Sequence, residues 1–211
     1  MPSLEHLVTG YRTFKATTFA QKKDMIMHSM RLGIKPTTLC ITCCDLRIAP
    51  DALTNSNPGE LYTVRNMGGF VPPYESTGAS GVISAIEYAV SQLKVENVIV
   101  MSHDHCDGIH TLLNYEKEPE KTIDPMGNWL GVAKEAKEAV QKQLAEKTEE
   151  EKEKALEQET VLVSLKNLLT YPWVKEGIEQ KKLLIYGMHF DVEEGELTCF
   201  NPTKRVFEPL T

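Results

Sequence analysis

The sequence lacks both long apolar runs and a surplus of basic residues. No apolar run approaches the roughly 20 residues that cross a bilayer, so we expect no membrane-spanning segment. Lysine and arginine number 23 against 30 aspartates and glutamates, and the net charge of -7 argues against a nucleic-acid surface. The first residues, Met1 to His6, have neither the basic start nor the apolar core of a secretory signal. These absences predict neither nucleic-acid nor membrane partners.

Cysteine is scarce, with five residues in the chain. An odd number of thiols in a medium-sized chain without a secretion signal does not suit a disulfide framework. It suits a reducing compartment, and we expect the protein to be cytoplasmic. In that setting metal binding or catalysis is the better explanation for cysteines. The five are Cys40, Cys43, Cys44, Cys106 and Cys199.

The rest of the composition is that of an ordinary globular protein. Hydrophobic residues make up 41% and charged residues 25% of the 211 residues, which is enough chain to bury a full core. We therefore predict a single domain over residues 1–211. Within it, spaced apolar residues over 3–33 predict one or two amphipathic helices, which form an N-terminal helical arm (residues 1–33) that Gly33 and Pro36 end.

Short apolar runs alternate with helical patterns after the arm. Such alternation predicts an α/β fold with a mostly parallel central sheet, flanked by helices on both faces. Strands are expected at 37–42, 60–65, 97–102, 182–187 and 197–200, the last after a hairpin-type turn at 194–195. Helices are expected at 50–53, 78–93, 129–158 and 160–170; the charge-rich stretch 129–158 is typical of a solvated helix.

Two cysteines and one histidine stand where predicted strands end. Cys43 closes the run 38–42, and His103 and Cys106 follow the run 98–102. Sites on parallel sheets lie at the carboxyl ends of the strands. Two thiolates and one imidazole suit zinc, and three protein ligands leave the fourth tetrahedral position open, as in a catalytic site. The simpler alternative is a buried thiol pair beside a core histidine, but the shared position at strand ends favours one zinc ion per chain.

Asp45 and Arg47 lie two and four residues beyond the first proposed ligand. An aspartate beside a zinc ion can accept a hydrogen bond from the group in the fourth position, or can itself occupy that position. A neighbouring arginine holds such a carboxylate and favours the open form. The alternative is a surface salt bridge at the start of a helix; next to a proposed ligand, the functional interpretation is favoured.

The segment 43–47, Cys-Cys-Asp-Leu-Arg, resembles the Cys-x-Asp-x-Arg signature of the β-class carbonic anhydrases, and 103–106 resembles their His-x-x-Cys. Segments 58–66, 71–74, 84–90, 169–174 and 186–191 also match blocks of the family, the second and third of them its plant-like branch in particular. The resemblance spans roughly residues 10–209 and implies a homodimer or a homotetramer. It also implies that Asp45 and Arg47 are catalytic. The implied reaction is hydration of CO₂ to bicarbonate and a proton by zinc-bound hydroxide.

The resemblance also assigns substrate-binding positions, and some of them depart from the family. Tyr62 and Tyr88 match aromatic positions that line the CO₂ site, whereas Ile34 replaces a glutamine that binds substrate in plant-like members. Met67 stands in a changed pocket wall, and Asp107 replaces the usual glycine after the second cysteine. An apolar pocket also suits carbonyl sulfide or carbon disulfide, so a hydrolase of these compounds is an alternative. A non-catalytic zinc-stabilised or bicarbonate-binding protein is another.

Three further expectations concern neighbours of these residues. His105 is either a proton shuttle or, as we prefer, an exposed loop histidine. Arg65 and Asn66 either steer the site or fix a loop, with neither favoured. The remaining cysteines, Cys40, Cys44 and Cys199, are expected to be core or packing residues.

Overall fold

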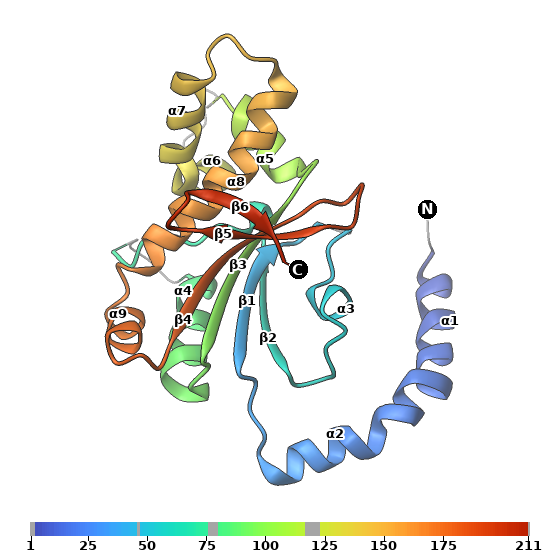
Figure 1. The fold of residues 1–211 in the computed structure, drawn as a ribbon. Coiled ribbons are helices and arrows are strands. Elements are labelled where there is room, and N and C mark those ends of the chain that lie inside the picture. The colour runs from blue at the N-terminus through green and yellow to red at the C-terminus, as the bar shows by residue number, and fades with distance from the viewer. Residues whose placement is uncertain (1–2, 46, 76–79, 117–122, 211) are drawn as a thin grey trace.

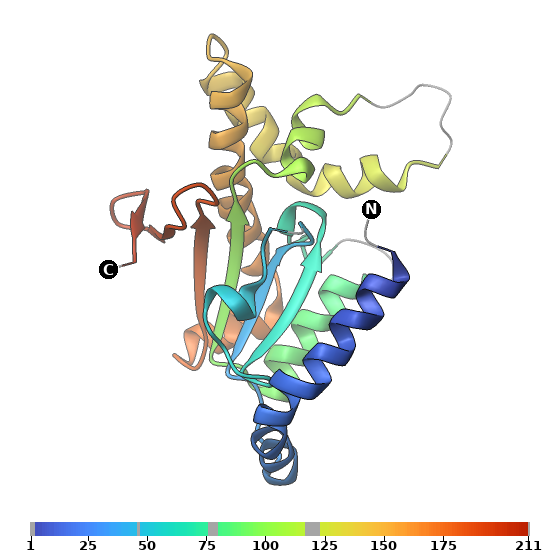
Figure 2. The same ribbon diagram turned by 90° about the vertical axis from the view of Figure 1, so that its right-hand side faces the viewer.

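The computed structural model describes residues 3–45, 47–75, 80–116 and 123–210. In this part of the chain six strands form one sheet in the order β2-β1-β3-β4-β5-β6 (Figure 1). The first four in this order run parallel, and the last two add an antiparallel hairpin at the edge opposite β2 (Figure 2). The mostly parallel sheet is therefore confirmed. The strands are β1 (Thr38–Cys43), β2 (Leu61–Asn66), β3 (Asn97–His103), β4 (Leu184–Phe190), β5 (Leu197–Asn201) and β6 (Val206–Pro209).

The two faces of the sheet are packed unequally. Successive side chains of a strand point to opposite faces, so Leu39 and Ile41 enter the larger core while Cys40 enters a smaller one. The larger core also takes side chains from α4 (Gly81–Glu87), α8 (Glu149–Leu168) and α9 (Pro172–Glu179). The smaller core contains Ile48 and Met101 and borders α3 (Pro50–Leu53). Helices contribute to both faces, as predicted, but most of the buried apolar surface is on one.

Strands β1 and β3 are neighbours and end at the same edge of the sheet. Their parallel register pairs Thr42 with Met101, so the last residue of each strand, Cys43 and His103, lies at the carboxyl edge. After β3 the chain makes a short turn, and Cys106 is the N-cap of α5 (Asp107–Asn114). The sheet order therefore brings together segments that are 60 residues apart in the sequence.

The charge-rich stretch 129–158 is not one solvated helix. Its last helix, α8, also continues past the boundary expected between 158 and 160. It is divided among α6 (Pro125–Leu130), a 3₁₀ turn (Gly131–Ala133), α7 (Lys134–Gln143) and the first half of α8 (Figure 1). Thr148 begins α8 through a capping box with Glu151, which satisfies amide groups at the helix start. One side of α8 is buried against the sheet and α5; its buried residues are Leu156, Glu157, Thr160, Val161, Val163, Ser164 and Leu168.

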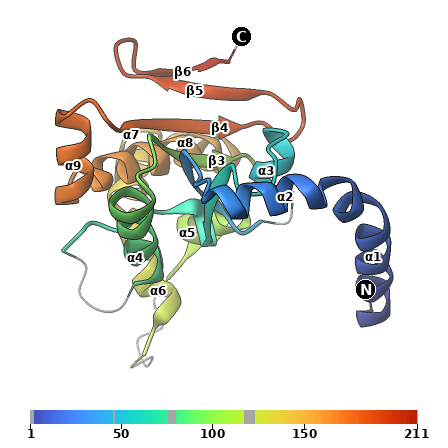
Figure 3. The same ribbon diagram turned by 90° about the horizontal axis from the view of Figure 1, so that it is seen from below.

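The N-terminal arm is helical, as predicted, and its first helix stands away from the sheet (Figures 1 and 3), while the rest of the arm borders a cavity beside β2. It consists of α1 (Leu4–Phe14), a π-helical turn (Lys15–Phe19) and α2 (Ala20–Leu32), and Gly33 ends it with a φ of 61°. Neither α1 nor α2 buries a residue in the isolated chain. Apolar side chains of α1 are exposed, among them Leu4 at 77% and Leu7 at 63%.

Several predicted boundaries differ from the structure. Strand β4 begins two residues later than expected and continues to Phe190, and β6 was not predicted. The helix expected at 78–93 is α4 followed by a π-helical turn (Tyr88–Leu93); positions 78 and 79 lie outside the described residues. Among the helices that the structure describes, none combines the length and the apolar character needed to cross a membrane.

Candidate metal centre

Cys43, His103 and Cys106 form one buried cluster at the carboxyl edge of the sheet. Their ligating atoms all lie within 4.8 Å of one another, and the two Sγ atoms are 3.6 Å apart. The exposed fraction is 4% for each cysteine and 0% for the histidine. The structure therefore brings together the three residues that the sequence predicted as ligands.

The hydrogen bonds of His103 fix which ring nitrogen is available. Its Nδ1 lies 2.8 Å from the carbonyl oxygen of Asp104, and this carbonyl accepts the Nδ1 proton. That arrangement leaves a lone pair on Nε2, which is buried and has no hydrogen-bond partner. A buried, unpartnered acceptor is costly, whereas a metal-binding histidine has this pattern, with the other nitrogen bonded to a carbonyl.

The two thiols cannot both ionise easily without a cation. A hydrogen bond from Cys106 lowers the pKa of Cys43 to about 4, because the thiolate is stabilised by its neighbour. The same hydrogen bond and burial raise the pKa of Cys106, since a second thiolate 3.6 Å away would be repelled. A dication at this point would remove the repulsion and hold both sulfurs as thiolates.

These residues fit zinc by distance and by ligand type. Two thiolates about 2.3 Å from a tetrahedral zinc ion lie about 3.8 Å apart, close to the observed 3.6 Å between Cys43 and Cys106. The free Nε2 of His103 supplies a third ligand. In the described part of the chain no fourth group joins this cluster, so a tetrahedral ion here would keep one position open.

Asp45 is held by Arg47 through both carboxylate oxygens. The guanidinium donates from Nε to Oδ1 at 2.9 Å and from an Nη to Oδ2 at 2.7 Å, and the Arg47 amide also donates to Oδ1. These bonds lower the pKa of Asp45, and the carboxylate in turn raises the pKa of Arg47. The same Nη donates to the carbonyl of His105. Arg47 thus connects the segments that carry Cys43 and Cys106.

Arg65 and Asn66 fix loops. Arg65 donates from Nε to the carbonyl of Cys43 and from one Nη to the carbonyls of Asp45 and Ile48. Asn66 exchanges two hydrogen bonds with the backbone of Phe70. Of the two interpretations left open by the sequence, these contacts support loop fixing.

Glu157 is a neighbour of the site that the sequence did not reveal. It projects from α8, is 2% exposed, and accepts a hydrogen bond from the amide of Cys106 at 3.1 Å. Burial raises its pKa to about 7. Glu157 lies in a run of charges that is typical of a solvated helix. The only signals in the sequence that one side of α8 is buried are the capping residue Thr148 and the spacing of apolar residues after it.

Met67 and Asp107 lie beside the cluster. Met67 packs against the core that includes Cys43 and Cys106, and Asp107 is the first residue of α5. The turn after Met67 requires glycine at position 68, because Gly68 has a φ of 79°. Position 108 in α5 also requires glycine, because a Cβ there would lie 2.8 Å from the amide nitrogen of Gly68.

The other expected pocket residues do not reach the cluster within one chain. Tyr62 lies four residues before the end of β2, about 13 Å along the strand. Its ring packs on Tyr88, with centroids 6.0 Å apart, and Tyr88 is half-exposed. Ile34 follows the arm and is 57% exposed.

The remaining expectations are settled by burial. Cys40 is buried and Cys199 half-buried, as predicted, but Cys44 is exposed. The prediction for Cys44 was wrong because β1 ends at Cys43 and the chain leaves the sheet there. His105 is an exposed loop residue paired with Glu193 at 2.8 Å, as we preferred.

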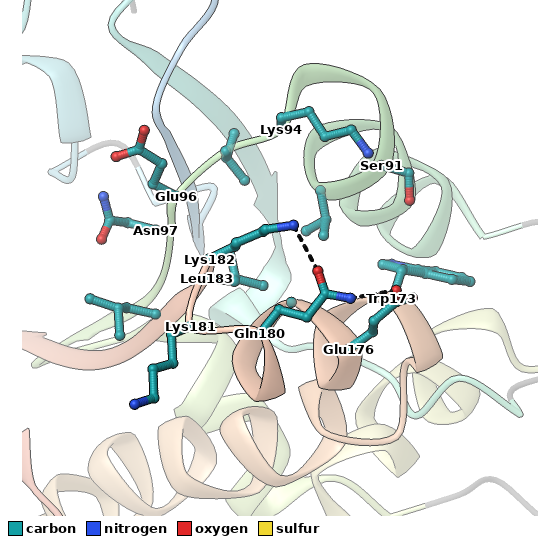
Figure 4. A pocket seen from close by; sticks show the side chains of 14 residues that line it. Ser91, Lys94, Glu96, Asn97, Trp173, Glu176, Gln180, Lys181, Lys182 and Leu183 are labelled. Carbon is teal, nitrogen blue, oxygen red and sulfur yellow. Dashed lines mark hydrogen bonds between the residues drawn. The ribbon is translucent and has the colours of Figure 1, made fainter.

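A cavity of about 650 Å³ lies away from the cluster, at the amino ends of β3 and β4 (Figure 4). Lys182 donates to Gln180 within it, and Gln180 donates to Glu176. None of the three cluster residues lines this cavity. Size alone would therefore point away from the chemistry that the sequence and the buried cluster indicate.

Fold and site together define an α/β protein with a buried cluster of two cysteines and one histidine that fits a metal ion. The family model of carbonic anhydrase matches residues 38–197. The chain is 34% identical over 197 residues to beta carbonic anhydrase 3 of Arabidopsis thaliana, covering 92% of this chain and 76% of that protein. This chain therefore belongs to the carbonic anhydrase family, in its β class, whose members are lyases.

Solved structures agree with this assignment. The β-carbonic anhydrase CcaA matches with a TM-score of 0.90 and 27% identity, covering 99% of this chain and 92% of that one. A tetrameric β-carbonic anhydrase of Sordaria macrospora shares the fold with a TM-score of 0.80 at 23% identity, covering 93% and 96%.

Proposed function

We propose that this protein binds one zinc ion per chain and interconverts carbon dioxide and bicarbonate. The observation that carries the proposal is the convergence of two buried thiols on an unpartnered His103 Nε2, with no fourth described residue in the cluster. Membership of the β-class carbonic anhydrases supports the same reaction.

Cys43, His103 and Cys106 would hold the ion. When bound, zinc supplies a Lewis acid that lowers the pKa of a water molecule in the open position toward neutrality. Asp104 fixes the tautomer of His103 through its carbonyl, and Glu157 holds the amide of Cys106. The chain therefore holds the ligands in place from two sides before any substrate arrives.

Asp45 orients the nucleophilic water. Oδ1 of Asp45 already accepts two hydrogen bonds from Arg47, whereas Oδ2 accepts one and keeps a lone pair for one further hydrogen bond. Because Arg47 engages both oxygens, Asp45 stays ionised and away from the open position. The water adds to the carbon of CO₂, which gives bicarbonate and releases one proton to buffer.

The pocket for CO₂ is completed by a second copy of the chain. Ile34, Tyr62 and Tyr88 do not reach the cluster within one chain, and α1 leaves an apolar stripe exposed. Exposed apolar area of this kind is typical of an interface. We therefore propose a homodimer or homotetramer, in line with the tetrameric relative from Sordaria macrospora. The five free thiols support the cytoplasm as the compartment.

Stopped-flow CO₂ hydration on protein of measured zinc content tests the function. We expect rapid hydration that is lost in Cys106→Ser, since one ligand is removed. Cys199→Ser is the matched control, because this cysteine is half-buried in β5 and lies outside the cluster. It should retain both zinc and activity.

Two outcomes would contradict the proposal. Equal rates in Cys106→Ser and Cys199→Ser would exclude the cluster as the active site. Background hydration with one zinc ion per chain would exclude CO₂ as the substrate, and assays with carbonyl sulfide and carbon disulfide would then separate a sulfur hydrolase from a binding protein.

A further inference from the structure

The cavity of about 650 Å³ at the amino ends of β3 and β4 lies at the end of the sheet opposite the metal centre (Figure 4). Two turns form its walls. One leads from the π-helical turn Tyr88–Leu93 into β3, and the other leads from α9 into β4. The amide of Leu184 donates to the carbonyl of Glu96 at 2.9 Å, which fixes the two turns to each other. The cavity is therefore preformed, and its volume suits a small organic molecule.

Part of the cavity wall is apolar. Val90, Val95 and Leu183 line it, and each is at least nine-tenths buried. Trp173 also lines it, and the indole ring packs edge-on against Tyr171 with the centroids 5.6 Å apart. Small-molecule sites combine such apolar walls with a few polar groups. This wall favours a ligand with an apolar or planar group.

Lysines give the cavity a charge opposite to that of the chain. Lys94, Lys181 and Lys182 line it, together with the carboxylates of two glutamates, Glu96 and Glu176. Within the described ranges of the chain, none of these three lysines forms an ion pair. The net charge of the chain is -7. An excess of unpaired ammonium groups at one cavity of an acidic protein favours an anion.

Two of these lysines extend toward the same part of the cavity, Lys94 from the turn before β3 and Lys182 from the turn before β4 (Figure 4). Lys182 donates from Nζ to Gln180 Oε1 at 2.9 Å, and Gln180 donates to Glu176 at 2.8 Å. The carboxylate of Glu176 is thus bonded to an amide and not to an ammonium group. Because an ammonium group has three donors, both lysines keep donors for a ligand.

An unsatisfied donor in the same wall is an independent indication of a ligand. The indole Nε1 of Trp173 is buried and has no hydrogen-bond partner among the residues that the structure describes. A buried donor without an acceptor costs free energy. The exposed side chain of Gln180 lies beside the indole (Figure 4), and its movement would let a ligand oxygen reach Nε1.

We propose that this cavity binds a phosphate monoester that carries an apolar or planar organic group. Lys94 and Lys182 would bind the dianionic phosphate as two point charges, the manner in which lysine recognises phosphate. The organic group would contact the apolar wall. None of the metal-centre residues lines the cavity, so this site does not depend on the reaction proposed above.

Isothermal titration calorimetry of the zinc-loaded protein with phenyl phosphate tests this site at pH 8, where the probe is a dianion joined to an aromatic ring. We expect one equivalent per chain, bound at least about tenfold more tightly than inorganic phosphate, because burial of the ring adds affinity. Lys94→Gln and Lys182→Gln should each weaken binding by about tenfold, since each removes a charge-assisted hydrogen bond. Zinc content should stay that of the parent.

Lys142→Gln is the matched control, because this lysine is exposed near the end of α7 and lies outside the cavity. It should bind phenyl phosphate as the parent does. A parent protein that binds no phenyl phosphate would overturn the proposal. So would equal affinities in Lys94→Gln, Lys182→Gln and Lys142→Gln, because the probe would then be bound elsewhere, for instance at the metal centre. Equal affinities of the parent for phenyl phosphate and inorganic phosphate would exclude the organic group.

Discussion

Arg47 decides which conformation Asp45 can adopt. Its guanidinium donates to both carboxylate oxygens of Asp45. One of its Nη atoms also donates to the carbonyl of His105. Lysine has one ammonium group and cannot form this two-point contact. At the scale of single residues, the fork of Arg47 therefore holds both the carboxylate and the loop that leads to Cys106.

Arg47→Lys should lower kcat/KM for CO₂ hydration by about 10- to 100-fold, as expected when a residue that orients the reacting groups is lost. Zinc content should stay near that of the parent, because the three ligands are intact. Arg205→Gln, in the exposed turn before β6, is the control and should leave the rate unchanged. An unchanged rate in Arg47→Lys would show that the two-point contact is dispensable.

We expect His189 to make the free energy of unfolding depend on pH. It is buried in β4, bonds to Ser102 through Nδ1, and has a pKa lowered by burial to about 4. The unfolded chain, with a histidine pKa of about 6.5, takes up the proton first. We therefore expect the contribution of His189 to the free energy of unfolding to be fully present above pH 6.5 and to be lost as the pH falls toward 4, by up to about 3 kcal/mol.

Urea unfolding at several values between pH 7 and pH 4.5 measures this effect. His189→Gln should make the free energy of unfolding depend less on pH than it does in the parent protein. Protonation of the metal ligands affects the parent and the variant alike, so it cancels when the two free energies are subtracted. Parallel curves for the two proteins would show that His189 does not carry the dependence.

At the scale of elements, α8 connects the charge-rich part of the chain to the metal centre. Its capping box begins at Thr148, and its buried side carries Glu157 to the amide of Cys106. The start of this helix is therefore a determinant of global stability, even though it is exposed.

Thr148→Ala should lower the free energy of unfolding by about 1 kcal/mol, the usual cost of losing an N-cap. Thr111→Ala is the control: its hydroxyl bonds to the carbonyl of Asp107 within α5 and satisfies no free amide. We expect a change within about 0.5 kcal/mol for the control. Urea midpoints of the two variants that coincide would refute the capping role.

The same helix shows where prediction from the sequence ends. The strands that carry Cys43 and His103 could be predicted because each is a short apolar run with ligand residues at its end. The break between α7 and α8 could not, because helical charge patterning continues through it and a capping signal is its only local mark. Edge strand β6 is half-exposed and lacks a continuous apolar run, so it was missed.

At the scale of the whole molecule, the exposed apolar side chains of the N-terminal arm have no packing partner in the core of the described single chain. Its apolar stripe covers nothing in the described structure, and Leu4, Leu7 and Tyr11 are each more than half exposed. Such a stripe costs free energy unless another surface covers it. A second copy of the chain is the occupant that the proposed assembly requires.

Leu7→Glu combined with Tyr11→Glu should shift the protein to a smaller species in light scattering coupled to size exclusion. The far-ultraviolet circular dichroism of the core should be retained, because α1 buries no residue there. Thr13→Glu, the control, places one such charge on the opposite side of α1 and should leave the mass unchanged. A double variant with the parent's mass would exclude the stripe as an interface.

The order of the strands has a consequence for how the protein matures. Cys43 and Cys106 are separated by 63 positions and meet because β1 pairs with β3. A nascent chain in which this pairing has not formed offers isolated thiols, which compete poorly for zinc against the chelators of the cell. Retention of the ion would therefore report that the central strands have assembled, so the metal would mark finished molecules as well as serve their chemistry.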